Sequence, residues 1–213
     1  MNINVNQATK YIRNALILDN VNLDLRSGNI YGLQGPNGSG KTMLMRLIAG
    51  LLHPTSGSVV VDGKVLGVDL DFPPSIGMLI ENPAFLAEYT GFQNLRLLAQ
   101  LQGKVGDVEI GEALSKVGLL EHDSRKYRKY SLGMKQRLGI AAAIMEAPEV
   151  LILDEPTNAL DDEGIEQICQ IIRAEKDRGA LVIMSSHDAA ILNSLADEIY
   201  IVSEGRVNKK VKD

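Results

Sequence analysis

The segment Gly35–Thr42, with the sequence GPNGSGKT, has the residue types and spacing of a phosphate-binding loop. Its glycines let backbone N–H groups turn toward a phosphate chain, Lys41 supplies a cation, and the hydroxyl of Thr42 can bind Mg²⁺. The residues before it predict a short buried strand at 29–33, and the apolar run after it predicts a helix. This context places the phosphates at a helix N-terminus. The pattern therefore indicates that the chain binds a nucleoside triphosphate.

A second group of chemically active residues follows the apolar run Val150–Leu153. This run predicts a buried parallel strand, which would deliver Asp154 and Glu155 to the sheet edge where ligands bind in open α/β folds. There Asp154 can hold Mg²⁺ together with Thr42, and Glu155 can orient an attacking water or take its proton. The alternative is that the two carboxylates only end the strand and cap the following turn. Beside a phosphate-binding loop, the catalytic interpretation is favoured.

Two further segments suit a phosphate site. Another apolar run ends at Ser185-Ser186-His187, which would place His187 at the same sheet edge to contact the terminal phosphate. A lone histidine is often structural, so that reading stays open. Ser131 and Gly133 stand at the start of a predicted long helix, where free N–H groups attract anions. The alternative for Ser131 is an ordinary helix N-cap.

The elements around these residues predict an α/β fold in a single domain, 1–213. Alternating apolar and polar residues over the first 30 positions predict antiparallel strands, and Asp62-Gly63 predicts a hairpin turn. The interval 83–148 has helical spacing and predicts a helical subdomain inserted into the core. After it, near-continuous apolar strands alternate with a helix, the pattern of a parallel sheet covered on both faces.

The amino-acid composition limits which kinds of molecule the chain is expected to bind and where it is expected to be located. The 22 basic and 27 acidic residues give a net charge of −5, which argues against nucleic acid as the main partner. The single cysteine, Cys169, lies among helix-spaced apolar residues and is expected to pack in the core. The apolar runs are too short for a transmembrane span, so no direct insertion into the membrane is expected. These features predict a soluble, cytoplasmic chain.

In the order and spacing of its motifs the chain resembles the ATP-binding-cassette ATPases, and the resemblance covers nearly all of it. Asp154 is similar to the Walker B aspartate of that family, Glu155 to its catalytic glutamate, and His187 to its switch histidine. The stretch SLGMKQR, from Ser131, resembles the signature sequence, and Asn158–Asp161 resembles the D-loop. The residues similar to the Walker A loop are Gly35, Pro36, Asn37, Gly38, Ser39, Gly40, Lys41 and Thr42.

The resemblance implies a P-loop ATPase of the RecA-like type, with a mostly parallel sheet, an N-terminal antiparallel β-subdomain and an inserted helical subdomain. ATP and Mg²⁺ would be bound between two chains arranged head to tail. One chain would supply Lys41 and the Walker A loop, and the other would supply Ser131 and Gly133. Asp161 would approach the nucleotide from the D-loop. Tyr11 occupies the place of the aromatic residue that stacks on adenine, although it could also pack on a strand.

The resemblance also implies partners. The second chain would be another copy or a paralogous ATPase subunit, and hydrolysis would drive a separate membrane-spanning permease. The chain would then sit on the inner face of the cell membrane through that permease. Phe85, Tyr89 and Phe92 could line the groove that receives a short permease helix, or they could pack inside the helical subdomain.

Two sites depart from the usual family pattern. Tyr130, Leu132 and Met134 alter the signature, and Glu81 stands where most members have a glutamine that touches Mg²⁺ and the attacking water. Glu81 could still approach the metal, but it adds a negative charge and lacks the amide donor. The combination of LIENPAF and YSLGMKQRL is similar to that of single-domain subunits of bacitracin- and lantibiotic-type bacterial exporters. This predicts a working variant and the export of an antimicrobial peptide or similar compound.

Two other functions remain as alternatives. A soluble cassette ATPase could act in complex assembly or on ribosomes, but the single cassette without a charged linker argues against the ribosomal type. A sensing or immunity module could bind ATP without productive turnover, an interpretation that depends only on Glu81 and the altered signature.

Overall fold

The computed structural model describes residues 1–81 and 84–210, which form two sheets and the helices around them. The strands are β1 (Asn2–Ile12), β2 (Ala15–Arg26), β3 (Ile30–Gln34), β4 (Ser56–Val61), β5 (Lys64–Val65), β6 (Ile76–Leu79), β7 (Val150–Leu153), β8 (Leu181–Ser185), β9 (Glu198–Ser203) and β10 (Arg206–Lys209). The helices are α1 (Lys41–Ile48), α2 (Gly91–Gln102), α3 (Asp107–Lys116), α4 (Leu132–Ile144), α5 (Asp162–Asp177) and α6 (Ala189–Leu195), with a 3₁₀ turn at Tyr127–Lys129.

The larger sheet has the strand order β10-β9-β3-β8-β7-β6, and only β10 runs antiparallel to its neighbour. Its central strands are apolar at nearly every position because helices or a second sheet cover both faces. Val150 and Ile152 of β7 belong to the hydrophobic cluster on one face, and Leu151 and Leu153 belong to the cluster on the other. The predicted parallel core is confirmed.

The smaller sheet, in the order β2-β1-β4-β5, is antiparallel throughout. Its first two strands alternate buried and exposed residues, as expected for a sheet with one face on the core. The predicted turn joins β4 to β5, with φ of 46° at Asp62 and 81° at Gly63. Two successive positive φ values are those of a type I′ turn, whose twist suits a two-residue hairpin.

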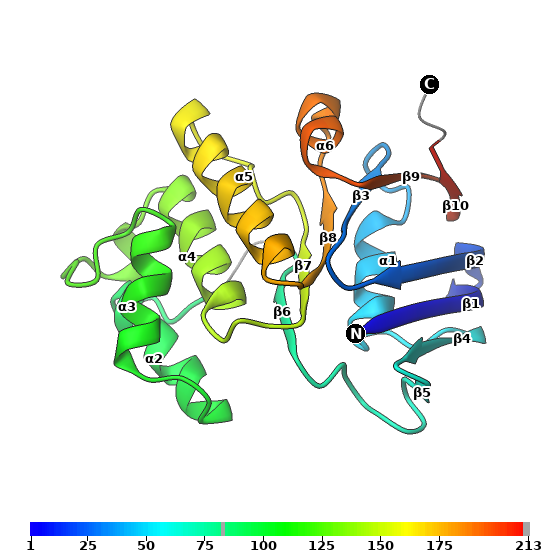
Figure 1. The fold of residues 1–213 in the computed structure, drawn as a ribbon, viewed down its shortest axis with the longest axis horizontal. Coiled ribbons are helices and arrows are strands. Elements are labelled where there is room, and N and C mark those ends of the chain that lie inside the picture. The colour runs from blue at the N-terminus through cyan, green and yellow to red at the C-terminus, as the bar shows by residue number, and fades with distance from the viewer. Residues whose placement is uncertain (82–83, 211–213) are drawn as a thin grey trace.

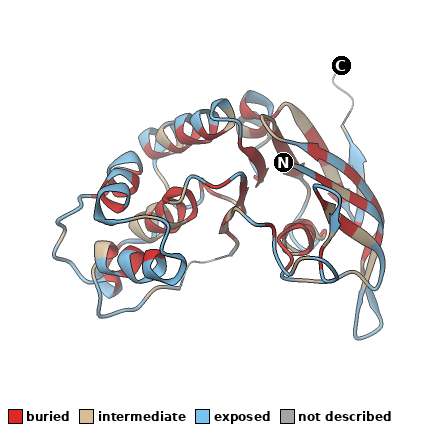
Figure 2. Cartoon of the chain, turned by 60° about the horizontal axis from the view of Figure 1, so that its bottom comes forward, coloured by how far each residue is buried: buried red, intermediate tan, exposed pale blue. Residues whose placement is uncertain are grey.

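Figure 1 shows these parts side by side: the antiparallel sheet and α1 at one end, the parallel sheet in the middle, and α2 to α4 at the other end. Helix α1 packs with the antiparallel sheet on one face of the parallel sheet, and α4, α5 and α6 pack on the other face. In Figure 2 the buried residues of helices and strands lie on the sides that face one another. The parallel sheet therefore lies between two packed layers.

Helices α2, α3 and α4 come between β6 and β7 in the chain, so the predicted helical insertion is confirmed. Its boundaries at 83 and 148 stay a prediction, and residue 83 lies outside the described residues. Helix α4 also packs directly on β6, so it connects the insertion to the parallel sheet. No helix within 1–81 and 84–210 is long and apolar enough to cross a membrane.

Candidate functional site

The loop between β3 and α1 turns sharply at two glycines. Gly38 has φ of 78° and Gly40 has φ of 112°, values that a residue with a side chain rarely adopts. Gly40 precedes the first residue of α1, and no side chain caps that end of the helix. The first N–H groups of α1 therefore remain available to an anion, as the predicted phosphate loop requires.

The loop also depends on a close approach to β9. A Cβ atom on Gly35 would lie 2.2 Å from the carbonyl oxygen of Val202, so only glycine fits there. The side chain of Ser39 is buried, and its Oγ is the one buried side-chain oxygen or nitrogen in the described residues without a hydrogen-bond partner. Buried polar atoms normally have partners, so this hydroxyl fits a site that holds a polar ligand.

Lys41 is only 7% exposed, and its Nζ donates to the carbonyl oxygens of Gly35 at 2.7 Å and Pro36 at 3.0 Å. The ammonium group is thus held back over the loop, where it faces the same space as the N-terminus of α1. A fixed cation beside free N–H groups suits a phosphate chain.

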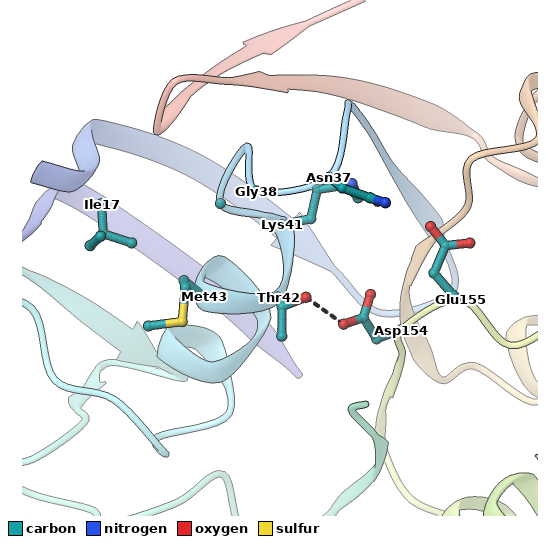
Figure 3. A pocket seen from close by; sticks show the side chains of 9 residues that line it. Ile17, Asn37, Gly38, Lys41, Thr42, Met43, Asp154 and Glu155 are labelled. Carbon is teal, nitrogen blue, oxygen red and sulfur yellow. Dashed lines mark hydrogen bonds between the residues drawn. The ribbon is translucent and has the colours of Figure 1, made fainter. Parts of the chain in front are cut away.

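The side chain of Asp154 connects two elements at the carboxyl edge of the sheet. Thr42 Oγ1 donates to Asp154 Oδ2 at 2.6 Å, and Ser185 Oγ donates to Asp154 Oδ1 at 2.5 Å. Figure 3 shows Thr42 and Asp154 facing each other, with Glu155 close by. Hydroxyl and carboxylate oxygens are the ligands that Mg²⁺ prefers, so the paired Thr42 and Asp154 fit the predicted metal position.

Glu155 has an unusual backbone conformation, with φ of 51°. The left-handed region costs a residue with a side chain about 1 kcal/mol or more, so other contacts must hold it. Its N–H donates to Ser185 Oγ at 2.9 Å, and its carbonyl accepts from Gln136 Nε2 at 3.0 Å. Its carboxylate accepts from the His187 N–H at 3.2 Å and lies 2.9 Å from His187 Nδ1. The structure thus brings the two predicted catalytic side chains into direct contact.

A cavity of about 280 Å³ lies over these groups. It brings the phosphate loop together with both acidic residues, and its lining is Ile17, Asn37, Gly38, Gly40, Lys41, Thr42, Met43, Asp154 and Glu155 (Figure 3). Tyr11 pairs with Leu16 across the β1–β2 hairpin and is about half exposed. It is not among the residues that line this cavity, so its contact with adenine stays a prediction.

Ser131 and Gly133 begin α4, and their contacts here are within the chain. Ser131 Oγ accepts from the Met134 N–H at 3.2 Å, so Ser131 is an N-cap. A Cβ atom on Gly133 would lie 2.8 Å from the carbonyl oxygen of Ala159, in the segment predicted as the D-loop. Asp161 caps α5 through its Oδ1, which accepts from the Gly164 N–H at 3.0 Å. Their contact with a nucleotide in another chain stays a prediction.

The structure explains one departure from the usual signature. The hydroxyl of Tyr130 accepts the N–H of Gly91, the first residue of α2, at 3.2 Å. That N–H has no partner within its own helix, so Tyr130 satisfies it. A Cβ on Gly91 would lie 2.6 Å from the same hydroxyl, so the two residues suit each other. Burial raises the pKa of Tyr130, and the Gly91 hydrogen bond partly offsets this rise.

The other departure, Glu81, pairs with an arginine of α1. Arg46 Nη2 lies 2.9 Å from Glu81 Oε1, and Arg46 is one helical turn beyond Thr42. Arg46 thus offsets the negative charge that Glu81 adds. Glu81 is outside the residues that line the cavity over Thr42 and Asp154, so its role as a metal ligand stays a prediction.

Two residues that support the site have no role that the sequence predicts. Ser185 is in the sequence a polar residue at the end of an apolar run, yet its side chain contacts both Asp154 and Glu155. Gln136 belongs to the stretch that resembles the signature, yet its side chain contacts Glu155. The signal in the sequence for Ser185 was its position at the end of a buried strand. The signal for Gln136 was its position one turn into the helix that begins at the signature.

The chain matches known proteins along most of its length. The family model described as ABC transporter matches residues 18–158. YybJ of Bacillus subtilis, an uncharacterised ABC transporter ATP-binding protein, is 44% identical over 99% of this chain and 96% of its own length. BcrA of Enterococcus faecalis, a bacitracin transport ATP-binding protein, is 39% identical over 98% of this chain and 68% of its own. SrtF of Streptococcus pyogenes, a lantibiotic transport ATP-binding protein, is 40% identical over 90% of this chain and 82% of its own.

Solved structures show the same fold. The ATP-binding subunit of an ABC transporter matches with a TM-score of 0.89 and 27% identity, over 100% of this chain and 91% of that one. A dimeric bacterial ABC transporter cassette matches with a TM-score of 0.87 and 25% identity, over 98% of this chain and 97% of that one.

Proposed function

This chain belongs to the ABC transporter family of ATPases, and on that premise we propose that it powers a separate membrane-spanning subunit by hydrolysing Mg²⁺-ATP between two chains. The observation that supports this most directly is the hydrogen bond from Thr42 to Asp154, with Glu155 beside it. It joins the phosphate loop to the acidic sheet edge in one cavity. Binding of the triphosphate and attack by water can therefore occur in the same place.

Each side chain at this edge has a role in the proposed reaction. The N–H groups of α1 and the ammonium of Lys41 bind the phosphates, and Thr42 and Asp154 hold Mg²⁺. When bound, Mg²⁺ offsets the charge of the phosphate oxygens. Glu155 orients the attacking water and accepts its proton. His187, which lies 2.9 Å from the Glu155 carboxylate, orients that carboxylate and contacts the terminal phosphate.

The second chain completes the site in this proposal. Ser131 is exposed at the N-terminus of α4, and it would face the terminal phosphate bound by the other chain, together with Gly133. The likeness to a dimeric cassette supports this arrangement. Asp161 and Tyr11, both exposed, would become covered by the second chain and by adenine, respectively. The partner chain is a second copy or a paralogous ATPase subunit.

A groove between the parallel sheet and the helical insertion suits the membrane partner. A cavity of about 280 Å³ is lined by residues of α1, β6, α2 and α4, among them Arg46, Met78, Phe85 and Leu98. Its walls are mainly apolar, and Arg46 and Glu81 form an ion pair at the same end of α1. A short amphipathic helix of the permease would fit such a surface. Phe85 and Phe92 both pack against the hydrophobic cluster of the helices, and Phe85 also lines this groove.

The names of two relatives indicate a class of transported compound. BcrA and SrtF are named for bacitracin and lantibiotic transport, so we infer that the permease exports an antimicrobial peptide or a similar compound. In this role the chain lies at the inner face of the cell membrane, held there by its partner. Purification from detergent-solubilised membranes should recover the chain with a membrane-spanning subunit. Recovery with ribosomes or a soluble assembly complex would instead support the alternative function.

The catalytic assignment is tested with Glu155→Gln. This change keeps the size of the side chain and removes the proton acceptor, so we expect hydrolysis to fall about 100-fold or more with ATP binding retained. Steady-state ATPase rates and equilibrium binding of ATP measure the two effects separately. A variant that hydrolyses ATP at close to the original rate would show that Glu155 is not the base.

A further inference from the structure

Helix α4 contacts the segment that begins at the catalytic glutamate in three places. Near its start, Gly133 lies against the carbonyl of Ala159. One turn further, Gln136 Nε2 donates to the carbonyl of Glu155 at 3.0 Å. Next to it, Arg137 Nη2 lies 3.8 Å from Asp161 Oδ1. These contacts connect one helix to both ends of the segment 155–161, so a shift of α4 must move that segment or break the contacts.

The contact from Gln136 is placed to control the peptide group of Glu155. Gln136 is buried, so water does not readily replace its amide. The carbonyl of Glu155 also accepts from the Asn158 N–H at 3.2 Å, while the N–H of Glu155 donates to Ser185. The residue is therefore held in its left-handed conformation from β8 on one side and from α4 on the other. Loss of one of these bonds frees the backbone that sets the direction of the Glu155 carboxylate.

The same helix begins with the residues proposed to face the second chain's nucleotide. Gln136 is five positions after Ser131 and three after Gly133 on a continuous helix. Rigid helices transmit small displacements along their length. A nucleotide that draws in the N-terminus of α4 would therefore change the position of Gln136 and of the carbonyl that it holds.

We propose that Gln136 is a positioning residue for Glu155, and that it couples the nucleotide bound against the N-terminus of α4 to the catalytic carboxylate of the same chain. The proposal depends on the proposed function, in which Glu155 is the base and α4 faces the ATP of the second chain. In a dimer, occupancy of one site then prepares the carboxylate that acts in the other. Gln136 itself need not touch either nucleotide.

The test is Gln136→Met in the whole 213-residue chain. Methionine has a similar length and shape but no amide donor, so it removes the bond to Glu155 with little change of volume. A small misplacement of a catalytic group can cost about 100-fold, and we expect kcat to fall about 10- to 100-fold. KM for ATP and equilibrium ATP binding should change less than about twofold, because the phosphate loop is unchanged.

A matched control is Gln170→Met on α5. The Gln170 amide donates to the exposed Glu166 at 3.2 Å, so this variant also loses a glutamine hydrogen bond but leaves Glu155 untouched. Its kcat should stay within about twofold of the unmodified chain. If Gln136→Met does not fold, Gln136→Glu replaces it, because a carboxylate of the same shape also cannot donate to the carbonyl.

The effect must also act through Glu155. On a Glu155→Gln background, Gln136→Met should leave the residual rate unchanged, because the group that it positions is already gone. An unchanged kcat for Gln136→Met, an equal loss of ATP binding, or a further fall of the residual rate in the double variant would each overturn the proposal. If Glu155→Gln itself hydrolyses ATP at the original rate, the proposed function fails first. If Glu155→Gln is inactive but Gln136→Met is fully active, the proposed function stands and only the role of Gln136 is wrong.

Discussion

At the scale of single residues, Ser185 controls the geometry of both acidic side chains. It is fully buried, its Oγ donates to Asp154, and the same atom accepts the N–H of Glu155. One hydroxyl therefore holds both the carboxylate proposed to bind Mg²⁺ and the strained backbone beside it. Buried networks of this kind are sensitive because each lost partner leaves another group unsatisfied.

We expect Ser185→Ala to lower the free energy of unfolding by about 1–3 kcal/mol, because the N–H of Glu155 and the carboxylate of Asp154, both in half-buried residues, each lose a partner. It should also lower kcat about 10- to 100-fold through the misplaced Asp154 and Glu155. Urea denaturation and steady-state ATPase rates measure the two effects.

Ser186→Ala is the control for this change. Ser186 is equally buried, but its Oγ accepts from the N–H of Asp188 and lies outside the network of the two acidic residues. The Ser186→Ala variant should have a lower free energy of unfolding with little change in kcat. Equal effects of the two variants on kcat would show that burial of a hydroxyl, and not its contact with Asp154, matters.

At the scale of elements, the approach of α4 to the segment 155–161 requires a residue without a side chain. Alanine in a helix is favoured over glycine by about 1 kcal/mol. At Gly133 that gain is opposed by a clash, because the new Cβ would lie 2.8 Å from the backbone oxygen of Ala159. The backbone of Ala159 cannot change its conformation as easily as a flexible side chain can. We therefore expect Gly133→Ala to gain no stability and to lose ATPase activity.

Gly111→Ala is a matched comparison within α3. Its Cβ would also meet an atom at 2.8 Å, but that atom is a carboxylate oxygen at the end of the flexible side chain of Glu121. We expect Gly111→Ala to gain up to about 1 kcal/mol, measured by denaturation, with activity unchanged. A gain of stability in Gly133→Ala would contradict the close contact between α4 and Ala159.

The hydrogen bond between Tyr130 and α2 gives a prediction that depends on pH. At pH 7 we expect Tyr130→Phe to lower the free energy of unfolding by about 1 kcal/mol, because the Gly91 N–H loses its acceptor. Burial raises the pKa of Tyr130 above its ordinary value of 10.0. The unfolded chain therefore releases this proton first as pH rises, and the contribution of Tyr130 is lost above pH 10. Urea denaturation at pH 7 and above pH 10 should show the gap between the two proteins closing, and a constant gap would contradict it.

The sequence predicted the elements that depend on local patterns. The phosphate loop, the strand before Asp154 and the hairpin at Asp62-Gly63 each have a local signature, and the structure has each of these elements. The family resemblance gave the order of the remaining motifs. Strands buried on both faces gave no clue to their register, however, because apolar residues occupy every position.

That register explains what was missed. Leu153 of β7 pairs with Met184 of β8, which places Asp154 beside Ser185. A local sequence pattern cannot predict this pairing, because the two residues are 31 positions apart in the chain. The contact of Gln136 with Glu155 likewise depends on how α4 packs across the sheet, and the pairing of Glu81 with Arg46 depends on the position of β6 beside α1. Tertiary packing, and not local propensity, decides these contacts.

At the scale of the whole molecule, the groups proposed for hydrolysis do not all line one cavity. The phosphate loop, Asp154 and Glu155 line one cavity, whereas Ser131 lies outside its lining and is exposed at the start of α4. The side chain of His187 is also 70% exposed at this face. A second chain with the opposite orientation would cover these groups and supply its own α4 to the first cavity.

This arrangement predicts that two inactive chains can restore one active site. Lys41→Met removes the cation proposed to bind phosphate, and Ser131→Arg blocks the N-terminus of α4, so each variant alone should hydrolyse ATP poorly. In an equal mixture, half of the dimers contain one of each, and one of their two sites combines an intact phosphate loop with an intact α4. We expect at most about a quarter of the original ATPase rate in the mixture, because the chain that supplies Glu155 to the intact site has its own α4 facing the disabled site and so loses the coupling proposed for Gln136. The rate per chain should fall on dilution. A Ser131→Arg variant that hydrolyses ATP at close to the original rate on its own would show that each chain acts without the α4 of the other.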